Sequence, residues 1–240
     1  MPSTSTERSL SVIVPAHCEA GNIVGTLENI SAALSPLSID AEVIVIDDGS
    51  TDGTSDLVRA NLHRFPAVTL LVNERNMGFG WTYRRGVCAA TRDRIVMVHG
   101  DNAWGAETLQ QFFGHVGDAD VVIGYTRDMW TSRTWRRAAI SKIFTGLLNL
   151  ITRRRLQYYN GLQIHKADIL KTLTIQSSGY GFQAEVLVKC LRRTETFIEV
   201  PMDLMEREHG DSKAFRMKNA VDVMRTLTRL CGLEWGVVRE

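Results

Sequence analysis

The sequence predicts an α/β fold in which a mostly parallel central sheet has helices on both faces. Short apolar runs rich in Val and Ile alternate with segments of helical periodicity along the first half of the chain. Such runs are typical of parallel strands buried on both faces, and the connections between them are expected to be right-handed crossovers. The 240 residues suffice for a full core, and 44% hydrophobic and 23% charged residues are ordinary for a globular protein.

Five strands are expected in the first half of the chain, each ending at turn residues. They span residues 10–16, 42–49, 68–74, 94–100 and 120–125. Helices are expected between them at about 20–34, 54–64, 79–91 and 105–116. This alternation is the pattern of a βαβ sheet.

The regular alternation stops after Tyr125. The expected elements that follow are a basic helical stretch at about 131–155, a turn at "YYNG", a short helix from about 167, a helix near 180–193, a strand at 196–202 and an amphipathic helix at 214–232 with its C-cap at Gly232. No repeat or Pro-rich linker divides the sequence, so residues 1–240 are predicted to form a single domain.

Charge and cysteine usage restrict the partners and the compartment. The net charge of +1 gives no overall field that would select a nucleic acid, and we expect none as a partner. The four cysteines are scattered without a C-x-x-C pair, which suits a reducing compartment. The amino terminus lacks the apolar core of a signal peptide, and no apolar run approaches the ~18 residues of a membrane-spanning helix. We therefore expect a cytoplasmic protein.

Polar residues gather at the carboxyl ends of the first four predicted strands, where open α/β sheets bind their ligands. They are Glu19, Asp47, Asp48, Asp52, Asn73 and Asp101. Like charges repel, so stability alone does not require this convergence of carboxylates. A ligand rich in hydrogen-bond donors, together with a cation, would explain it.

Two of these strand ends have alternative interpretations. The segment "DDGSTDGT" (47–54) can accept hydrogen bonds from a base or ribose, but an Asx turn that caps the next helix explains Ser50, Thr51 and Asp52 equally well. That alternative explains Asp47 and Asp48 together less well. The "GFG" at 78–80 begins a dinucleotide fingerprint, yet its sixth position is Tyr83 and it follows the third strand, so it carries little weight.

The ordered set of motifs resembles the family 2 glycosyltransferases with the GT-A, Rossmann-like fold. The motifs are "VIVPAHCEAGNI", "VIVIDDGSTDGT", "NERNMGFG" and "HGDN", followed by "GYGFQAE", "IEVPM" and "REHGDSK". The later ones are most similar to the polyprenyl-phosphate sugar synthases, of which dolichol-phosphate mannose synthase is an example. The resemblance runs from about residue 9 to 213, and it implies a nucleotide-sugar-binding half at 9–125, an acceptor-binding half at 126–213 and a C-terminal helix at 214–240.

The resemblance implies a divalent metal, Mg²⁺ or Mn²⁺, at the end of the fourth strand. The family carries an Asp-x-Asp motif there, which holds the ion against the donor diphosphate. In this sequence His99 replaces the first aspartate, so Asp101 is the expected metal ligand and catalytic residue. His99 is a second metal candidate, since imidazole suits Mn²⁺ better than Mg²⁺; its alternative role is a ring that packs near the nucleotide. Related enzymes often have a polar residue two positions after the second aspartate, where this chain has Ala103.

The resemblance also places the donor. The implied donor-binding residues are Pro15, His17, Glu19, Asp47, Asp48, Asn76, Gly78, Gly100 and Asp101. The pair His17 and Cys18 departs from the Tyr and Asn that are common at these positions. His17 can still stack on the base, whereas Cys18 is expected to be a packing residue.

A basic segment at 126–161 contains eight cations and a single acid, Asp128. Its centre, "IFTGLLNLI" (143–151), is apolar on nearly all sides, and Trp130 and Trp135 lie near it. This composition is typical of a helix in a bilayer interface, where anionic lipid attracts the cations. A core helix with a solvated basic face explains it equally well, and the resemblance favours the interface because a polyprenyl phosphate resides in the membrane.

The expected function is therefore that of an inverting, metal-dependent glycosyltransferase that moves a hexose from a GDP- or UDP-linked sugar to a polyprenyl phosphate. The implied acceptor-phosphate residues are Arg127, Arg137, Ser141, Arg207 and Lys213, with Arg207 also implied in catalysis. Glu185 is a candidate catalytic base; alternatively it orients Gln183 and the adjacent loops.

Three alternatives remain open at this point. They are transfer to a carbohydrate or small-molecule hydroxyl with Glu185 as base, a sugar-phosphate nucleotidyltransferase, and a non-catalytic nucleotide-sugar binder. We expect the protein to lie peripherally at the cytoplasmic face of a membrane, attached through residues 130–155 or through a partner. A membrane-protein partner and a homo-oligomer are the two assemblies considered.

Overall fold

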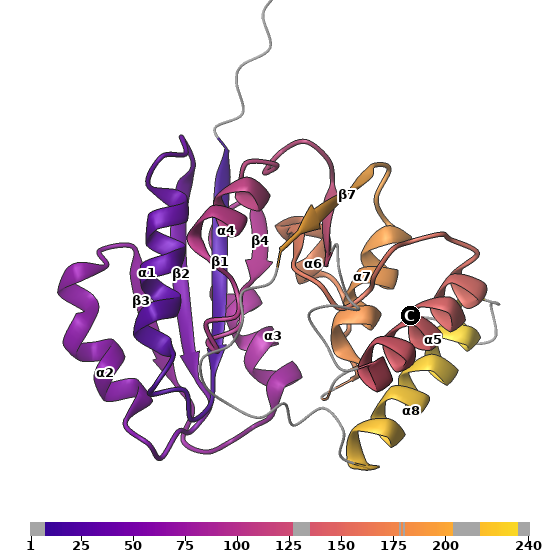
Figure 1. The fold of residues 1–240 in the computed structure, drawn as a ribbon, viewed down its shortest axis with the longest axis horizontal. Coiled ribbons are helices and arrows are strands. Elements are labelled where there is room, and N and C mark those ends of the chain that lie inside the picture. Colours follow the sequence, from indigo (N-terminus) through magenta and orange to yellow (C-terminus); the bar gives the residue numbers. More distant parts are fainter. Residues whose placement is uncertain (1–7, 127–134, 178, 180, 204–216, 235–240) are drawn as a thin grey trace, which may run out of the picture.

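A seven-stranded sheet forms the centre of the molecule in a computed structural model, which describes residues 8–126, 135–177, 179, 181–203 and 217–234 (Figure 1). Its strands are β1 (Ser9–Ala16), β2 (Asp40–Asp47), β3 (Val68–Val72), β4 (Arg94–Met97), β5 (Val121–Thr126), β6 (Gln163–Lys166) and β7 (Phe197–Met202). Their order across the sheet is β3-β2-β1-β4-β6-β5-β7.

Eight α-helices and one short 3-10 helix are found in the described ranges. They are α1 (Ile23–Leu34), α2 (Thr54–Asn61), η1 (Leu62–Arg64), α3 (Phe79–Ala89), α4 (Ala106–Phe113), α5 (Trp135–Thr152), α6 (Ala167–Lys171), α7 (Phe182–Leu191) and α8 (Met217–Glu234). None of them is both long enough and apolar enough to cross a membrane.

The sheet is mostly parallel, as predicted. Strand β1 is parallel to β2 and β4, β2 is parallel to β3, and β5 is parallel to β7. Only β6 runs in the opposite direction, antiparallel to both β4 and β5. The carboxyl ends of the six other strands therefore lie at one edge of the sheet, which is where α/β proteins bind ligands.

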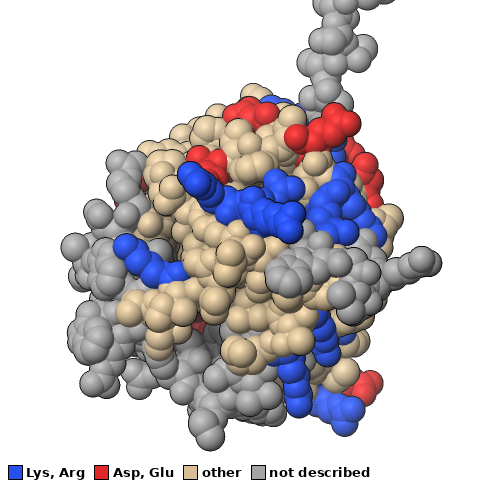
Figure 2. Space-filling view, turned by 90° about the vertical axis from the view of Figure 1, so that its right-hand side faces the viewer, with Lys and Arg blue, Asp and Glu red and all other residues tan. Residues whose placement is uncertain are grey.

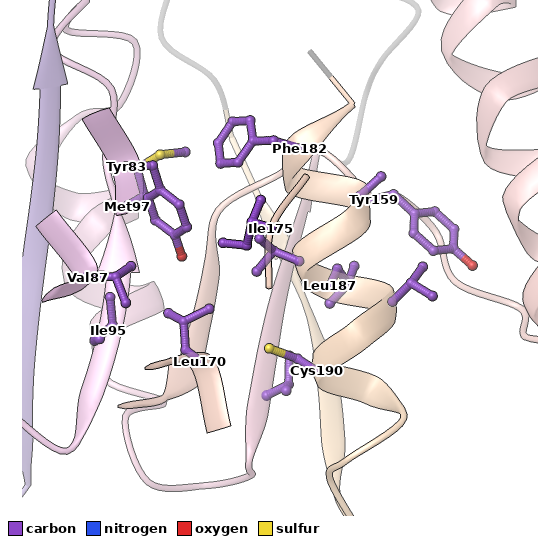
Figure 3. Close-up of a cluster of buried hydrophobic side chains, with 14 of the residues drawn as sticks. Tyr83, Val87, Ile95, Met97, Tyr159, Leu170, Ile175, Phe182, Leu187 and Cys190 are labelled. Carbon is purple, nitrogen blue, oxygen red and sulfur yellow. The ribbon is translucent and has the colours of Figure 1, made fainter. Parts of the chain in front are cut away.

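Side chains that alternate along the strands fill one hydrophobic cluster on each face of the sheet. On β1, Val12 and Val14 pack in the cluster formed with α1 and α4, while Ile13 packs in the cluster formed with α3 and α7. The second cluster reaches from Tyr83 of α3 to Leu187 of α7 (Figure 3). Burial on both faces explains why the sequences of these strands are nearly continuous apolar runs. The prediction of helices on both faces is confirmed.

Two details of the predicted element pattern are wrong. Strand β6 was not expected, because the sequence indicated only a turn and a short helix in this region. Helix α8 continues to Glu234, so Gly232 lies inside the helix and is not its C-cap. The other predicted strands and helices are present, with ends that differ by a few residues.

Candidate active site

The loops after β1 and β2 are joined by side chains of the second loop. Ser50 Oγ accepts a hydrogen bond from the N–H of Cys18 at 2.8 Å, and Asp52 Oδ2 accepts one from the N–H of Ala20 at 2.9 Å. Asp52 Oδ1 also accepts one from Thr54 Oγ1 at 2.5 Å. Burial acts to raise the pKa of Asp52, but the bonds from Thr54 and Ala20 outweigh it and lower that pKa. The bond from the N–H of Thr54 to Asp52 Oδ1 at 3.1 Å forms an Asx turn, as the alternative predicted, but the N-cap of α2 is Gly53, so neither Ser50 nor Thr51 caps that helix.

Asp48 fixes the loop that leads into α3. Its side chain is buried and accepts hydrogen bonds from Asn73 Nδ2 at 2.7 Å, from the N–H of Met77 at 2.8 Å and from the N–H of Gly78 at 3.0 Å. A carboxylate that receives three internal donors is held in one orientation. Asp48 therefore organises the loop at 76–78, a role that the sequence did not reveal.

Asp47 is also buried and closes the turn after β2. Its Oδ1 accepts a hydrogen bond from the N–H of Ser50 at 3.0 Å. Gly49 has a φ of 66°, and a Cβ there would lie 2.5 Å from the carbonyl carbon of Arg75. The turn therefore requires glycine, and it brings the β2 and β3 loops into contact.

The remaining predicted donor residues lie at the same edge of the sheet. His17 is half-buried, and its Nδ1 lies 2.9 Å from the carbonyl oxygen of Asp48. Asn76 is exposed and accepts a hydrogen bond from the N–H of Gly78 at 3.0 Å. Glu19 accepts one from Asn22 Nδ2 at 2.7 Å, just before α1.

The end of β4 is fixed against β1 and α1. The N–H of Gly100 donates to the carbonyl of Pro15 at 3.2 Å, and a Cβ on Gly100 would lie 3.2 Å from that oxygen. Asn102 has a φ of 53°; its N–H donates to Thr26 Oγ1 at 3.0 Å, and its Oδ1 accepts from Asn29 Nδ2 at 2.8 Å. Strand β1 thereby fixes the residue before Asp101, and helix α1 fixes the residue after it. Asn102 is a site residue that the sequence reading missed, although Asn is one of the few residues that adopt positive φ readily.

The ring of His99 packs against aromatic side chains. It lies parallel to Phe79 with ring centroids 5.0 Å apart, and Phe79 contacts Phe182 edge-on with centroids 4.9 Å apart. The three rings come from the end of β4, from α3 and from α7. This stack corresponds to the packing role that was the alternative to metal ligation.

The carboxylate after β4 suits a hard divalent ion, provided that substrate oxygens complete the coordination shell of that ion. Among the described residues, no group of three or more His, Cys, Asp or Glu side chains is arranged to hold a metal by itself. Mg²⁺ in phosphate-transfer sites typically takes one or two carboxylates and completes its shell with water and substrate phosphates. Asp101, half-buried at the ligand-binding edge of the sheet, fits that requirement.

Glu185 points into the protein. It is 2% exposed, lies in the first turn of α7, and accepts hydrogen bonds from the N–H of Ser177 at 2.8 Å and from Lys189 Nζ at 2.8 Å. The contact with Ser177 favours the orienting alternative over a catalytic base, but it acts on the adjacent segment and not on Gln183.

The predicted acceptor-phosphate residues are only partly described. Arg137 and Ser141 both belong to α5, where Ser141 is half-buried, and the side chain of Arg137 lies outside the described part. Arg127, Arg207 and Lys213 lie outside the described residues, so their clustering stays a prediction.

Comparison with known proteins places the chain in a family. The model of glycosyl transferase family 2 matches residues 11–174. The chain belongs to this family and is a family 2 glycosyltransferase.

Two individual relatives show which kind of transferase this chain is similar to. An undecaprenyl-phosphate mannosyltransferase from Micrococcus luteus is 30% identical over 218 residues, which cover 84% of this chain and 85% of the relative. An undecaprenyl-phosphate 4-deoxy-4-formamido-L-arabinose transferase from Edwardsiella ictaluri is 25% identical over 221 residues, which cover 91% of this chain and 66% of that protein.

Solved structures share the fold. Glucosyl-3-phosphoglycerate synthase from Mycobacterium tuberculosis, determined with Mn²⁺, UDP-glucose and phosphoglyceric acid, superposes with a TM-score of 0.73 at 21% identity over 94% of this chain and 80% of that one. A second structure of that enzyme, with Mg²⁺ and UDP, gives a TM-score of 0.68 at 21% identity and the same coverage. The predicted GT-A fold is confirmed.

Proposed function

We propose that this glycosyltransferase moves a hexose from a GDP- or UDP-linked donor to a polyprenyl phosphate, with inversion at the anomeric carbon. The observation that carries the proposal is the position of Asp101: it follows β4 at the edge of the sheet where the parallel strands end, between a residue fixed by β1 and a residue fixed by α1. The similarity to two transferases named for undecaprenyl phosphate supports the choice of acceptor.

The donor would lie across the loops that follow β1, β2 and β3. Asp47 and His17 would meet the base, and Asp48 holds the 76–78 loop against which the nucleotide would rest. Pro15 and Gly100 bring the ends of β1 and β4 together, which sets the distance between the base region and Asp101.

Asp101 would hold Mg²⁺ or Mn²⁺, and such an ion, when bound, neutralises charge that develops on the leaving diphosphate. We assign His99 to packing, because its ring is stacked on Phe79. The protein's own part at this position is to keep the Asp101 carboxylate directed towards the diphosphate.

The acceptor determines which side chains the reaction needs. An oxygen of the lipid phosphate attacks the anomeric carbon, the bond from that carbon to the diphosphate oxygen breaks on the opposite side, and the configuration inverts. A phosphate monoester with a second pKa near ~6 is already mostly dianionic at neutral pH, so no general base is required. Arg127, Arg137, Ser141, Arg207 and Lys213 are the proposed phosphate-binding residues, because guanidinium and ammonium groups suit phosphate oxygens.

Helix α5 has an exposed apolar stripe that suits a membrane surface. Ile140, Ile143, Leu147 and Leu150 recur every three or four residues, so they share one side of the helix, and they are 53%, 64%, 43% and 74% exposed. Leu148, on the other side, is fully buried. The helix therefore combines both sequence interpretations, with one side in the core and an apolar side in solvent.

Positively charged side chains lie near the apolar stripe of α5. Lys142 on α5 is exposed, as are Arg153 and Arg155 just after it. Figure 2 shows Lys and Arg side chains on the side of the molecule that carries α5, α7 and α8, together with a smaller number of Asp and Glu side chains near its edges. An apolar stripe with flanking cations is suited to the interface of an anionic bilayer, and we propose that the protein binds the membrane peripherally through it.

A transfer assay tests the function. Purified protein is incubated with labelled GDP-mannose, UDP-glucose or UDP-galactose, with undecaprenyl phosphate in vesicles, and with Mg²⁺, Mn²⁺ or EDTA. We expect one donor to give a labelled lipid product that is lost with EDTA and regained with the metal. Transfer to water-soluble sugars in the absence of lipid would instead support the hydroxyl-acceptor alternative, and donor binding without any transfer would support a binder.

A further inference from the structure

A buried ion pair lies on α7, behind the edge of the sheet that carries Asp101. Glu185 and Lys189 are one helical turn apart, their side chains are 3% and 8% exposed, and Oε1 of the glutamate lies 2.8 Å from Nζ of the lysine. Removing two charges from water is unfavourable unless their remaining hydrogen-bonding capacity is also met. The other partners of the pair therefore show what it holds in place.

Those partners belong to the segment at 174–177, which precedes α7, and they include three of its main-chain groups. The N–H groups of Gln176 and Ser177 donate to Oε1 and Oε2 of Glu185 at 3.0 and 2.8 Å. Lys189 Nζ donates to the carbonyl of Thr174 at 2.6 Å. Burial acts to raise the pKa of Glu185, but the bonds from Lys189, Ser177 and Gln176 outweigh it and lower that pKa, so the carboxylate stays charged.

The same segment is tied to two other helices. The carbonyl of Ile175 accepts a hydrogen bond from Arg84 of α3 at 2.6 Å, and Ser177 Oγ lies 2.8 Å from Thr226 Oγ1 of α8. The backbone at Gly181 passes so close to α8 that a Cβ there would lie 2.3 Å from Thr226 Oγ1. The segment therefore sets where α7 begins relative to α3 and α8.

The first residue of α7 transmits this placement towards the site. Phe182 is buried and lies next to Tyr83, with ring centroids 5.2 Å apart (Figure 3). It also contacts Phe79 edge-on. Phe79 in turn stacks on His99, two residues before Asp101. A continuous set of contacts thus runs from the ion pair to the end of β4.

We propose that Glu185 and Lys189 are positioning residues for the transfer reaction. They fix the segment at 174–177, so that Phe182 holds the ring of Phe79 against His99 beside Asp101. The kinetic part of this proposal rests on the proposed function; the structural part does not. Both carboxylate oxygens of Glu185 are committed to internal donors, which assigns it this role in place of proton abstraction.

The test compares Glu185→Gln, Lys189→Met and the double variant with the wild-type protein, each as the full chain. Glu185→Gln leaves a buried ammonium without its countercharge and should lower the unfolding midpoint by roughly 5–10 °C. Removing both charges should restore much of this loss, because neither charge is then left unpaired. If Glu185→Gln fails to fold, Lys189→Met replaces it in the stability, exchange and kinetic comparisons. In that variant the buried carboxyl of Glu185 can protonate, so no unpaired charge has to remain in the core.

Hydrogen exchange provides the structural measurement. In Glu185→Gln the amides at 176 and 177 should exchange faster, and so should those at 79–83, at the start of α3. A role in stability alone predicts no change at 79–83 below the unfolding transition. Unchanged exchange at 79–83 would overturn the positioning role, whether or not the protein proves active on a lipid phosphate.

Transfer kinetics provide the second measurement, at a temperature at which every variant is folded. We expect Glu185→Gln to lower kcat by about tenfold or more, the double variant to recover part of it, and the pH profile of kcat to keep its acidic limb. A double variant no faster than Glu185→Gln, with the acidic limb lost in both, would identify Glu185 as a base and overturn the proposal. Absence of transfer by the wild-type protein would instead refute the proposed function.

Discussion

The imidazole of His99 lies parallel to the ring of Phe79, with an angle of 4° between the planes and centroids 5.0 Å apart. His99 occupies the first position of the metal motif, where the family has an aspartate. A ring stacked in this way stabilises the packing through its flat shape, so an aromatic residue in place of His99 should preserve the contact with Phe79. We therefore propose that metal binding at this motif rests on Asp101.

This division of roles predicts different outcomes at the two positions. His99→Phe should retain most of the transfer rate, whereas Asp101→Asn should lower it by roughly two orders of magnitude or more. Binding of Mn²⁺ in the presence of UDP or GDP, measured by electron paramagnetic resonance, should survive His99→Phe and be lost in Asp101→Asn. Loss of Mn²⁺ binding in both variants would show that the imidazole is a ligand.

The buried contacts of Asp48 predict a shared loss of stability and donor affinity. Asp48→Ala removes the acceptor of the Met77 N–H and one of the two acceptors of the Gly78 N–H, which should lower the free energy of unfolding by about 1–3 kcal/mol. Calorimetry should show weaker nucleotide binding as well, because the 76–78 loop is no longer ordered. Asp56→Asn is the matched control, since that carboxylate is 80% exposed and pairs with the surface residue Arg59. Unchanged nucleotide affinity in Asp48→Ala would place the donor elsewhere.

The ligand-binding edge could be predicted from the sequence because it follows from topology. Parallel strands bring their carboxyl ends together, so Asp47, Asp48 and Asp101 had to meet at one edge. Their hydrogen-bond partners could not be predicted in the same way. The donors to Asp48 lie between 25 and 30 residues further along the chain, and only the packed fold brings them close.

Strand β6 shows why one part of the fold was missed. It has only four residues, and two of them, Gln163 and His165, are polar side chains buried in the sheet. Gln163 Nε2 donates to the carbonyl of Tyr159 at 2.6 Å, and its Oε1 lies 3.1 Å from His165 Nε2. A local pattern of polar residues suggests a turn. Here the hydrogen-bonded pairing with β4 and β5 makes the segment a strand in spite of that local preference.

His165 makes the protein sensitive to acid. It is 2% exposed, its Nδ1 has no hydrogen-bond partner among the described residues, and burial lowers its pKa from 6.5 to about 3. Below pH 6.5 the unfolded chain binds a proton that the folded protein excludes, so stability falls as the pH drops towards 3. The loss should reach on the order of 1–2 kcal/mol at about pH 5.

Replacing this imidazole by a neutral amide should flatten that dependence. His165→Gln is expected to lose less stability than the wild-type protein between about pH 7 and 5, as measured by urea unfolding. His63→Gln, on the exposed helix η1, is the control and should change the slope less. An equal slope in the wild-type protein and His165→Gln would mean that His165 is protonated in the folded state.

The two sides of α5 predict two different phenotypes on one helix. Ile143→Gln combined with Leu150→Gln alters side chains that are 64% and 74% exposed, so the free energy of unfolding should change by no more than about 0.5 kcal/mol per site. Leu148→Ala, on the fully buried side, should cost about 2–5 kcal/mol. The exposed pair therefore tests membrane binding without the loss of fold that a buried substitution would bring.

Sedimentation with vesicles that contain anionic lipid provides the measurement. Two leucine-sized side chains that enter the interface contribute together on the order of 2 kcal/mol, so the exposed double variant should bind roughly thirtyfold more weakly. Binding of the wild-type protein should also weaken as salt rises from about 0.1 to 1 M, because the attraction to Lys142, Arg153 and Arg155 is then screened within ~3 Å. Leu148→Ala, measured below its unfolding transition, should bind vesicles as the wild-type protein does. Equal binding by the exposed double variant and the wild-type protein would remove α5 from the membrane contact and leave a partner protein as the better explanation.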